Sequence, residues 1–240
     1  MTSGRPPRDA QRRRVYLAET PLPGRSLPSL DECAAFADSV VGSLWWELRF
    51  PHLTLAAVPR MRPGYGARQA FYCEVPNGPT ITLPRRYRTT GVVLHELCHW
   101  ALARDLDLPN HGRTFARLLL DATEEFGGAK RADALAESYR AQRVHVGAPP
   151  HLGPDGRLRY GWDERLRLGR GRLFDVHCHE RDGGGTVCIR ARFDGWGRNG
   201  TSVRLRDDAE TLVVRTSSVW DVRAVADMPT PTPTPATPGR

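Results

Sequence analysis

The chain has 240 residues, of which 40% are hydrophobic and 26% are charged, and its formal net charge at pH 7 is +8. This composition provides enough apolar side chains for a core and excludes collagen-like, coiled-coil and wholly disordered proteins. No apolar run reaches the roughly 20 residues that a membrane-spanning helix requires. We therefore expect a globular protein of one large or two small domains, with no membrane partner.

Arginine carries nearly all of the positive charge, because Lys130 is the single lysine among 35 basic residues. This skew fits a GC-rich coding sequence better than phosphate recognition, so nucleic acid is a weakly supported partner. No apolar stretch of the kind found in a secretory signal follows the N-terminal charges. The five cysteines form no CxxC pair. These features predict reduced thiols and a cytoplasmic location.

Residues 1–28 are rich in Arg and Pro and predict a flexible arm, with a short helix near 12–18 as an alternative. A helix is predicted to begin at Ser29, because Ser29 and Glu32 have the spacing of a capping box. Three short strand-like runs follow the resulting helix, separated by Pro and Gly. They cover residues 53–58, 69–75 and 80–83.

Helical periodicity dominates the next part of the chain. Helices are predicted from about 90 to 105, from 111–112 to 127, and from about 130 to 143. The second of these has an apolar stripe that is typical of a helix packed on a core. Helices and short strands in one segment indicate an α+β domain over residues 29–146.

Pro and Gly cluster at 147–156, which predicts a linker. Beyond it, short runs with alternating polarity predict a small antiparallel, barrel-like β-domain over residues 157–226. Asn199-Gly200 is a strong hairpin signal within it. The Pro/Thr repeats at 227–240 predict a disordered tail. The six expected strands cover residues 158–162, 172–179, 186–193, 201–206, 211–216 and 219–225.

One motif dominates the sequence, His95-Glu96-Leu97-Cys98-His99, and it lies in a predicted helix. Residues four apart share one face of a helix, so the His95 and His99 imidazoles can bind the same metal ion. Glu96 is turned away by about 100° and can reach a metal-bound water without being a ligand. The pattern predicts a Zn²⁺ site in which Glu96 is the general base.

Catalytic zinc usually has three protein ligands and one open position for water. His111 is the expected third ligand, because eleven residues separate it from His99 and allow the chain to fold back. Gly112 beside it allows a close approach of the backbone. Glu124 and Glu125 on the following helix are alternative third ligands.

Four segments together resemble a family of small bacterial metallohydrolases: RDAQRRRVYLAE, ITLP at 81–84, HELCHW, and HG followed by Phe115. At greater distance, the HExxH and HG elements are similar to the SprT-like zinc proteases. The resemblance covers about residues 8–146. It implies a zincin fold, with a small sheet beside the active-site helix and zinc held by His95, His99 and His111. SprT-like relatives imply peptide-bond hydrolysis, in some members near DNA, but this chain lacks the Cys-rich zinc ribbon of some of those members.

A weaker group of metal-ligand types lies in the β-rich part. If the two strands that contain them pair with matched apolar faces, His177, His179 and Cys188 share the polar face. Such ligands could bind zinc or copper, and we favour the alternative of a solvated polar face. The same register separates Cys178 from Cys188, so no disulfide is expected between them.

Two functions from different classes follow from these patterns. The first is a zinc-dependent metallohydrolase, most simply a peptidase, in which Glu96 activates a water held by the metal. Arg113 could steady a substrate carbonyl or an oxyanion, and we favour the alternative that it is a solvent-facing helix residue. The second is an adaptor with a structural or vestigial zinc site. Its β-domain would then bind a protein or a nucleic acid. Four aromatic residues lie among arginines in a pattern that suits base stacking; they are Tyr160, Trp162, Trp196 and Trp220.

Overall fold

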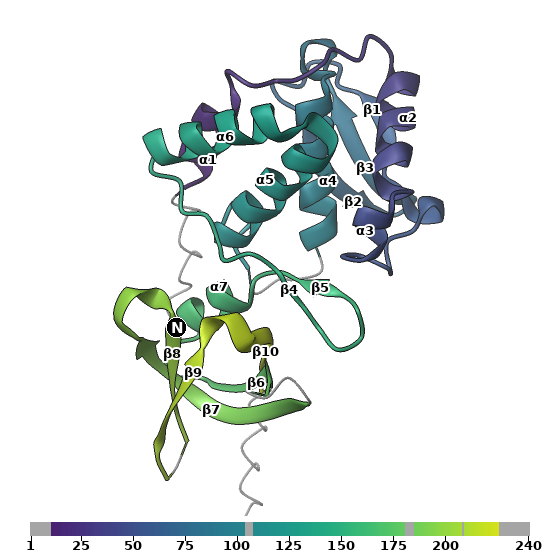
Figure 1. Ribbon diagram of the computed structural model, residues 1–240. Helices are drawn as coiled ribbons and strands as arrows, with labels where there is room; N and C mark the ends of the chain where they lie inside the picture. The colour runs from purple at the N-terminus through teal and green to yellow at the C-terminus, as the bar shows by residue number, and fades with distance from the viewer. Residues whose placement is uncertain (1–10, 104–107, 181–184, 208, 226–240) are drawn as a thin grey trace, which may run out of the picture.

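Helices and strands are mixed throughout the computed structural model, which describes residues 11–103, 108–180, 185–207 and 209–225. An α-helical unit with a small sheet lies above a mainly β unit in Figure 1. The expected α+β class is confirmed. The described residues include no helix that is both long and apolar enough to span a membrane.

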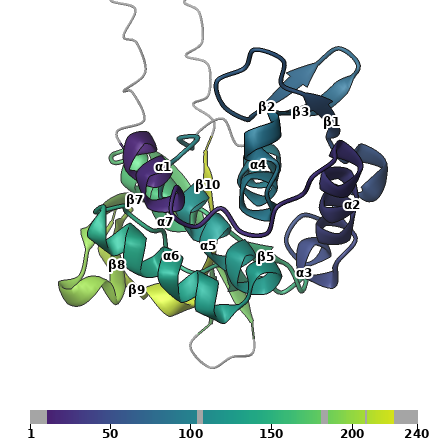
Figure 2. The ribbon, with the colours of Figure 1, turned by 90° about the horizontal axis from the view of Figure 1, so that it is seen from above.

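The first unit contains six helices around a three-stranded sheet of order β1-β3-β2. Strand β1 is parallel to β3, and β2 is antiparallel to β3. Helix α4 lies in the middle of this unit, between α5 and α2 (Figure 2). The elements are α1 (Arg12–Glu19), α2 (Leu30–Val41), α3 (Leu44–Glu47), β1 (Arg60–Pro63), β2 (Phe71–Val75), β3 (Gly78–Leu83), α4 (Thr90–Leu102), α5 (Arg113–Gly127) and α6 (Ala129–Ala141).

Local sequence explains several boundaries of this unit. The capping box predicted at Ser29 is present, since its side chain accepts from the Glu32 amide and the Glu32 carboxylate accepts from the Ser29 amide. The strand predicted over 53–58 is wrong. That segment forms the short 3₁₀ turn η1 (Leu55–Ala57), and the strand β1 begins afterwards at Arg60.

The short helix predicted near residues 12–18 is confirmed as α1 (Arg12–Glu19), but the described part of the N-terminal segment is not a free arm. Val15 and Ala18 of α1 are fully buried, and α1 packs on α6. Gln11 is also buried, and its side chain bonds to the backbone of His111 and His145. Residues 1–10 and the predicted tail at 227–240 lie outside the described residues.

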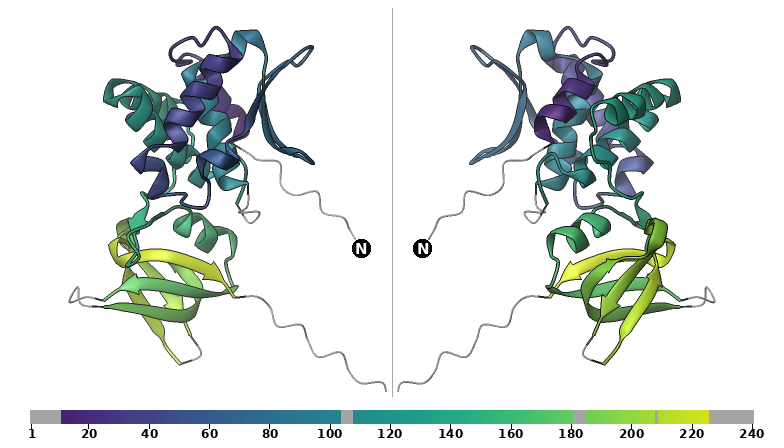
Figure 3. Two further views of the ribbon diagram at one scale, coloured as in Figure 1. Left: turned by 90° about the vertical axis from the view of Figure 1, so that its right-hand side faces the viewer. Right: turned by 90° about the vertical axis from the view of Figure 1, so that its left-hand side faces the viewer.

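The second unit is a five-stranded antiparallel sheet of order β10-β6-β7-β8-β9. The predicted antiparallel strands are present, but within the described residues the edge strands β9 and β10 do not pair, so the sheet is not closed into the barrel-like arrangement that was predicted. Helix α7 covers the apolar face instead, as Trp162 and Leu166 pack among the buried sheet residues (Figure 3). The elements are β4 (His151–Leu152), β5 (Leu158–Arg159), α7 (Trp162–Leu168), β6 (Leu173–His179), β7 (Thr186–Trp196), β8 (Ser202–Arg206), β9 (Thr211–Arg215) and β10 (Val219–Ala224).

Other expectations for this unit were partly correct. The strand predicted over 158–162 is wrong beyond Arg159, because the chain turns at Gly161 with φ of +82° and enters α7. The predicted register of β6 and β7 is confirmed, with His177 opposite Cys188 and Cys178 opposite Val187. Asn199 and Gly200 both have positive φ, as a tight turn of this sequence requires.

Candidate metal centre

Helix α4 brings the first two histidines together. The Thr89 side chain caps its N-terminus by accepting from the amide of Val92, and the helix runs without interruption to Leu102. His95 is only 3% exposed, and the Nε2 atoms of His95 and His99 lie 3.1 Å apart. The i, i+4 arrangement expected from the sequence is therefore present.

His111 joins this pair from the start of α5. Its Nε2 atom lies 3.2 Å from that of His99, and its side chain is buried. The Gln11 amide donates to the His111 carbonyl oxygen at 2.8 Å, which ties this part of the chain to the N-terminal segment. The three histidines form the one group of metal-ligand type that meets at a common point among the described residues.

The spacing of two nitrogen pairs, His95 with His99 and His99 with His111, is close to that around a tetrahedral zinc ion, and all three ligand atoms lie within 4.8 Å of one another. Zn–N bonds of about 2.0–2.1 Å at a tetrahedral angle place two ligand nitrogens about 3.3–3.4 Å apart. The separations found here are 3.1 and 3.2 Å. Burial and the neighbouring His95 and His111 lower the pKa of His99, so its imidazole is neutral and can act as a ligand. The donor set therefore fits zinc, while the identity of the metal is an inference from chemistry.

The Glu19 carboxylate binds Nδ1 of His95, the ring nitrogen that faces away from the other histidines. The Nδ1–H of His95 donates to the Glu19 Oε2 at 2.7 Å, and the hydroxyl of Tyr139 is 3.5 Å from the other carboxylate oxygen. Burial disfavours the charged imidazole, but the Glu19 carboxylate outweighs it and raises the pKa of His95. A carboxylate on Nδ1 fixes the ring and leaves Nε2 directed at the metal, as second partners of metal-bound histidines do.

Glu96 has the burial expected of a general base. It is 3% exposed and lies at the wall of the same cavity as His99 and His111. Burial raises the pKa of its carboxyl, while His95 and the Tyr72 backbone amide act in the opposite direction. A carboxylate of raised pKa next to a metal site can both accept and return a proton near neutral pH.

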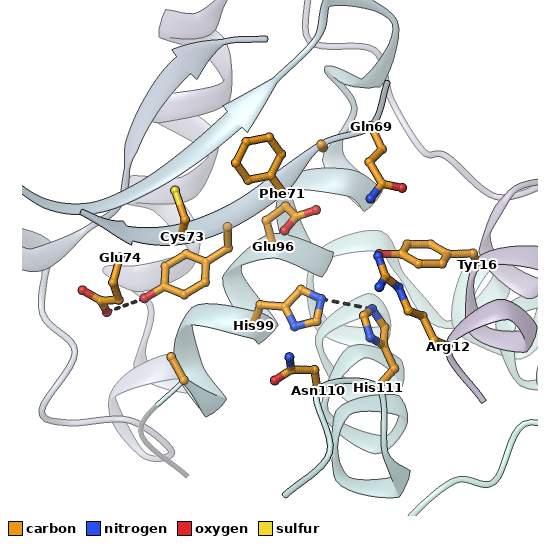
Figure 4. A pocket seen from close by; sticks show the side chains of 13 residues that line it. Arg12, Tyr16, Gln69, Phe71, Cys73, Glu74, Glu96, His99, Asn110 and His111 are labelled. Carbon is orange, nitrogen blue, oxygen red and sulfur yellow. Dashed lines mark hydrogen bonds between the residues drawn. The ribbon is translucent and has the colours of Figure 1, made fainter. Parts of the chain in front are cut away.

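The cavity has a volume of about 410 Å³ and two different walls (Figure 4). Arg12 and Tyr16 of α1 form one wall, and the Tyr16 ring packs on His95 and His111 with centroid distances of 5.4 and 5.1 Å. Strand β2 forms the other wall. Burial and the Glu96 carboxylate raise the pKa of Tyr16, so its hydroxyl keeps its proton and can donate a hydrogen bond.

Several predicted candidates lie elsewhere. Glu124 and Glu125 are exposed near the C-terminal end of α5, roughly 18 Å along the helix from its start, and do not approach the histidines. Arg113 does not line this cavity. In the second unit, the Nε2 of His179 contacts the carbonyl of Leu152, and no metal-binding group forms there among the described residues.

Sequence reasoning missed four residues that surround the histidines: Gln11, Arg12, Tyr16 and Glu19. All four fall in the RDAQRRRVYLAE segment, which carried part of the family resemblance. That resemblance was the available signal, since nothing in local spacing connects this segment with a motif some 80 residues later.

No family model, curated protein or solved structure matches the chain significantly.

Proposed function

We propose that the protein is a zinc-dependent hydrolase, most simply a peptidase, whose first unit is a zincin-like domain. The observation that carries the proposal is the convergence of the Nε2 atoms of His95, His99 and His111 beside Glu96 in an accessible cavity. A site of metal, carboxylate and open space is the arrangement that hydrolysis of an amide or ester requires.

Different residues would bind the metal, transfer the proton and stabilise the oxyanion. His95, His99 and His111 would hold the ion, which when bound lowers the pKa of water and polarises a carbonyl. Glu96 would accept a proton from the attacking water and return it to the leaving nitrogen. Tyr16 and Arg12 lie where a hydrogen bond and a positive charge would stabilise a developing oxyanion, the less favoured of the two roles considered for Arg113.

A peptide is the favoured substrate because of the position of β2. This strand lies at the edge of the described sheet, so one side of its backbone faces no other strand there, and its residues line the cavity. An extended peptide can add to such an edge through main-chain hydrogen bonds, which would place its backbone beside Glu96.

The adaptor function has less support. Tyr160, Trp162 and Trp220 are each at most 7% exposed, which leaves their rings little surface for stacking on bases. Trp196, the fourth of these aromatic residues, is partly buried. Several arginines of the second sheet are ion-paired: Arg190 with Asp175 at 2.7 Å, and Arg204 and Arg206 with Asp194. This pairing reduces the positive field that nucleic acid would meet.

Glu96→Gln tests the hydrolase proposal. We expect the variant to bind zinc at one ion per chain, as the wild type does, and to lose at least about 100-fold in turnover of a fluorescence-quenched peptide library. Elemental analysis measures the zinc, and Glu125→Gln on the exposed part of α5 is the control. Unchanged peptide hydrolysis in Glu96→Gln would exclude the proposed role of Glu96, and absence of zinc from the wild type would exclude the metal site.

A further inference from the structure

Helix α7 is part of the second unit and also contacts the first. Trp162 and Leu166 are one helical turn apart and lie in the core of the second unit. Glu164 is two residues from each of them and thus on the opposite face of the helix, which is directed at α5 of the first unit. Figure 1 shows α7 between the helices of the first unit and the C-terminal sheet.

The Glu164 carboxylate binds the N-terminus of α5. Its Oε1 accepts from the amide of Arg113 at 2.9 Å, and its Oε2 accepts from the amide of Thr114 at 2.8 Å. Glu164 is only 4% exposed. The first amides of a helix have no partner within it and carry partial positive charge, so a buried carboxylate satisfies both needs.

Gly112 makes this contact possible. It is the N-cap residue of α5 and has no side chain to cap the helix. A Cβ atom at this position would lie 2.3 Å from the Glu164 Oε1. The backbone of Gly112 is in an ordinary conformation, with φ of −70°, so the need for glycine here is one of space and not of strain.

This contact acts one residue away from a metal ligand. His111 directly precedes Gly112, and its carbonyl is held on the other side by the Gln11 amide. The His111 backbone is therefore fixed between the N-terminal segment and α7. The His111 ring, whose Nε2 lies 3.2 Å from that of His99, depends on that placement.

We propose that Glu164 is a positioning residue through which the second unit holds His111 in the metal site. The inference rests on the proposed zinc centre. Without Glu164 the start of α5 loses two charge-assisted hydrogen bonds, and His111 loses its fixed position. The C-terminal unit thus has a part in metal binding although it contributes no ligand.

Glu164→Gln in the full chain tests this proposal. A glutamine offers one acceptor oxygen to two amides and opposes the second amide with its own NH₂ group. We expect the zinc dissociation constant, measured by competition with a chelator, to rise roughly 10- to 100-fold, as for other losses of support behind a metal ligand. Glu125→Gln, at an exposed position of α5, should leave the zinc dissociation constant unchanged. The visible absorption of bound Co²⁺ should change in Glu164→Gln alone.

Gly112→Ala provides an independent variant, because it keeps the carboxylate and blocks its approach. It should weaken zinc binding to a similar extent, and the double variant should be no weaker than either single one, since both remove the same contact. Zinc binding that is undisturbed in both single variants would overturn the inference and leave the proposed function standing. A wild-type chain that binds no zinc would overturn both.

Discussion

Glu19 shows how one side chain outside the motif sets the chemistry within it. Its bond to Nδ1 fixes the proton of His95 on that nitrogen and leaves the lone pair of Nε2 for a metal. Nothing in the HELCH motif indicates this partner, because Glu19 precedes His95 by 76 residues. The spacing of His95 and His99, in contrast, could be predicted because a helix alone dictates it.

Replacing Glu19 is therefore expected to weaken the metal site. In Glu19→Gln the neutral amide oxygen still accepts from His95 but no longer raises the basicity of the ring, so zinc affinity should fall about tenfold. Chelator competition measures the change. Glu137→Gln, an exposed position on the neighbouring helix α6, is the control and should bind zinc as the wild type does. Equal affinity in Glu19→Gln would show that this carboxylate does not support the ligand.

At the level of elements, the most reliable predictions were those fixed by local patterns. The capping box of α2 and the register of β6 with β7 follow from residues that are close in sequence or from alternating polarity. Helix α7 was missed because its apolar residues Trp162 and Leu166 are too few for a helical period, and its role depends on tertiary contacts. The barrel was wrong for the same reason, since α7 covers the face that closure would have buried.

The register of β6 and β7 places Cys178 and Cys188 on opposite faces of the sheet, which predicts that their thiols differ in reactivity. Cys178 is 2% exposed, and burial raises its pKa to about 11, whereas Cys188 lies exposed on the opposite face. With a pKa of about 11, roughly one part in a thousand of the Cys178 thiol is ionised at pH 8. Cys178 should react slowly, because only the thiolate is the nucleophile. We expect iodoacetamide to modify Cys188 at least about 100-fold faster, as measured by peptide mass spectrometry. In denaturant the two rates should become similar; similar rates in the native protein would contradict the register.

On the scale of the whole molecule, the metal site gathers residues from three distant stretches. Gln11 and Glu19 come from the N-terminal segment, the ligands from α4 and α5, and Glu164 from α7. The sequence predicted His95, His99 and His111 as one group, and the structure brings these three residues together. The role of Glu96 as general base stays a prediction. The supporting residues could not be predicted, because their contacts depend on how distant elements pack and not on spacing along the chain.

A site of this kind is expected to couple zinc binding to global stability. Free zinc at about 100 times its dissociation constant stabilises the native state by about 2.7 kcal/mol. For a chain of this size that corresponds to a rise in Tm of about 5–11 °C. Calorimetry with zinc and with EDTA measures the difference. His95→Ala serves as the control, and its Tm should not respond to zinc. A wild-type Tm that is equal in zinc and EDTA would argue against a preformed site.

The bond between α7 and α5 also orders events in time. Glu164 follows Arg113 by 51 residues, so a ribosome that adds roughly 5–20 residues per second completes His111 about 3–10 s before its support exists. During that interval the three histidines have been synthesised but the start of α5 is uncapped. If zinc binds as proposed, a growing chain would reach full affinity for the metal only after its second half has emerged, and metal loading would be a late step in maturation.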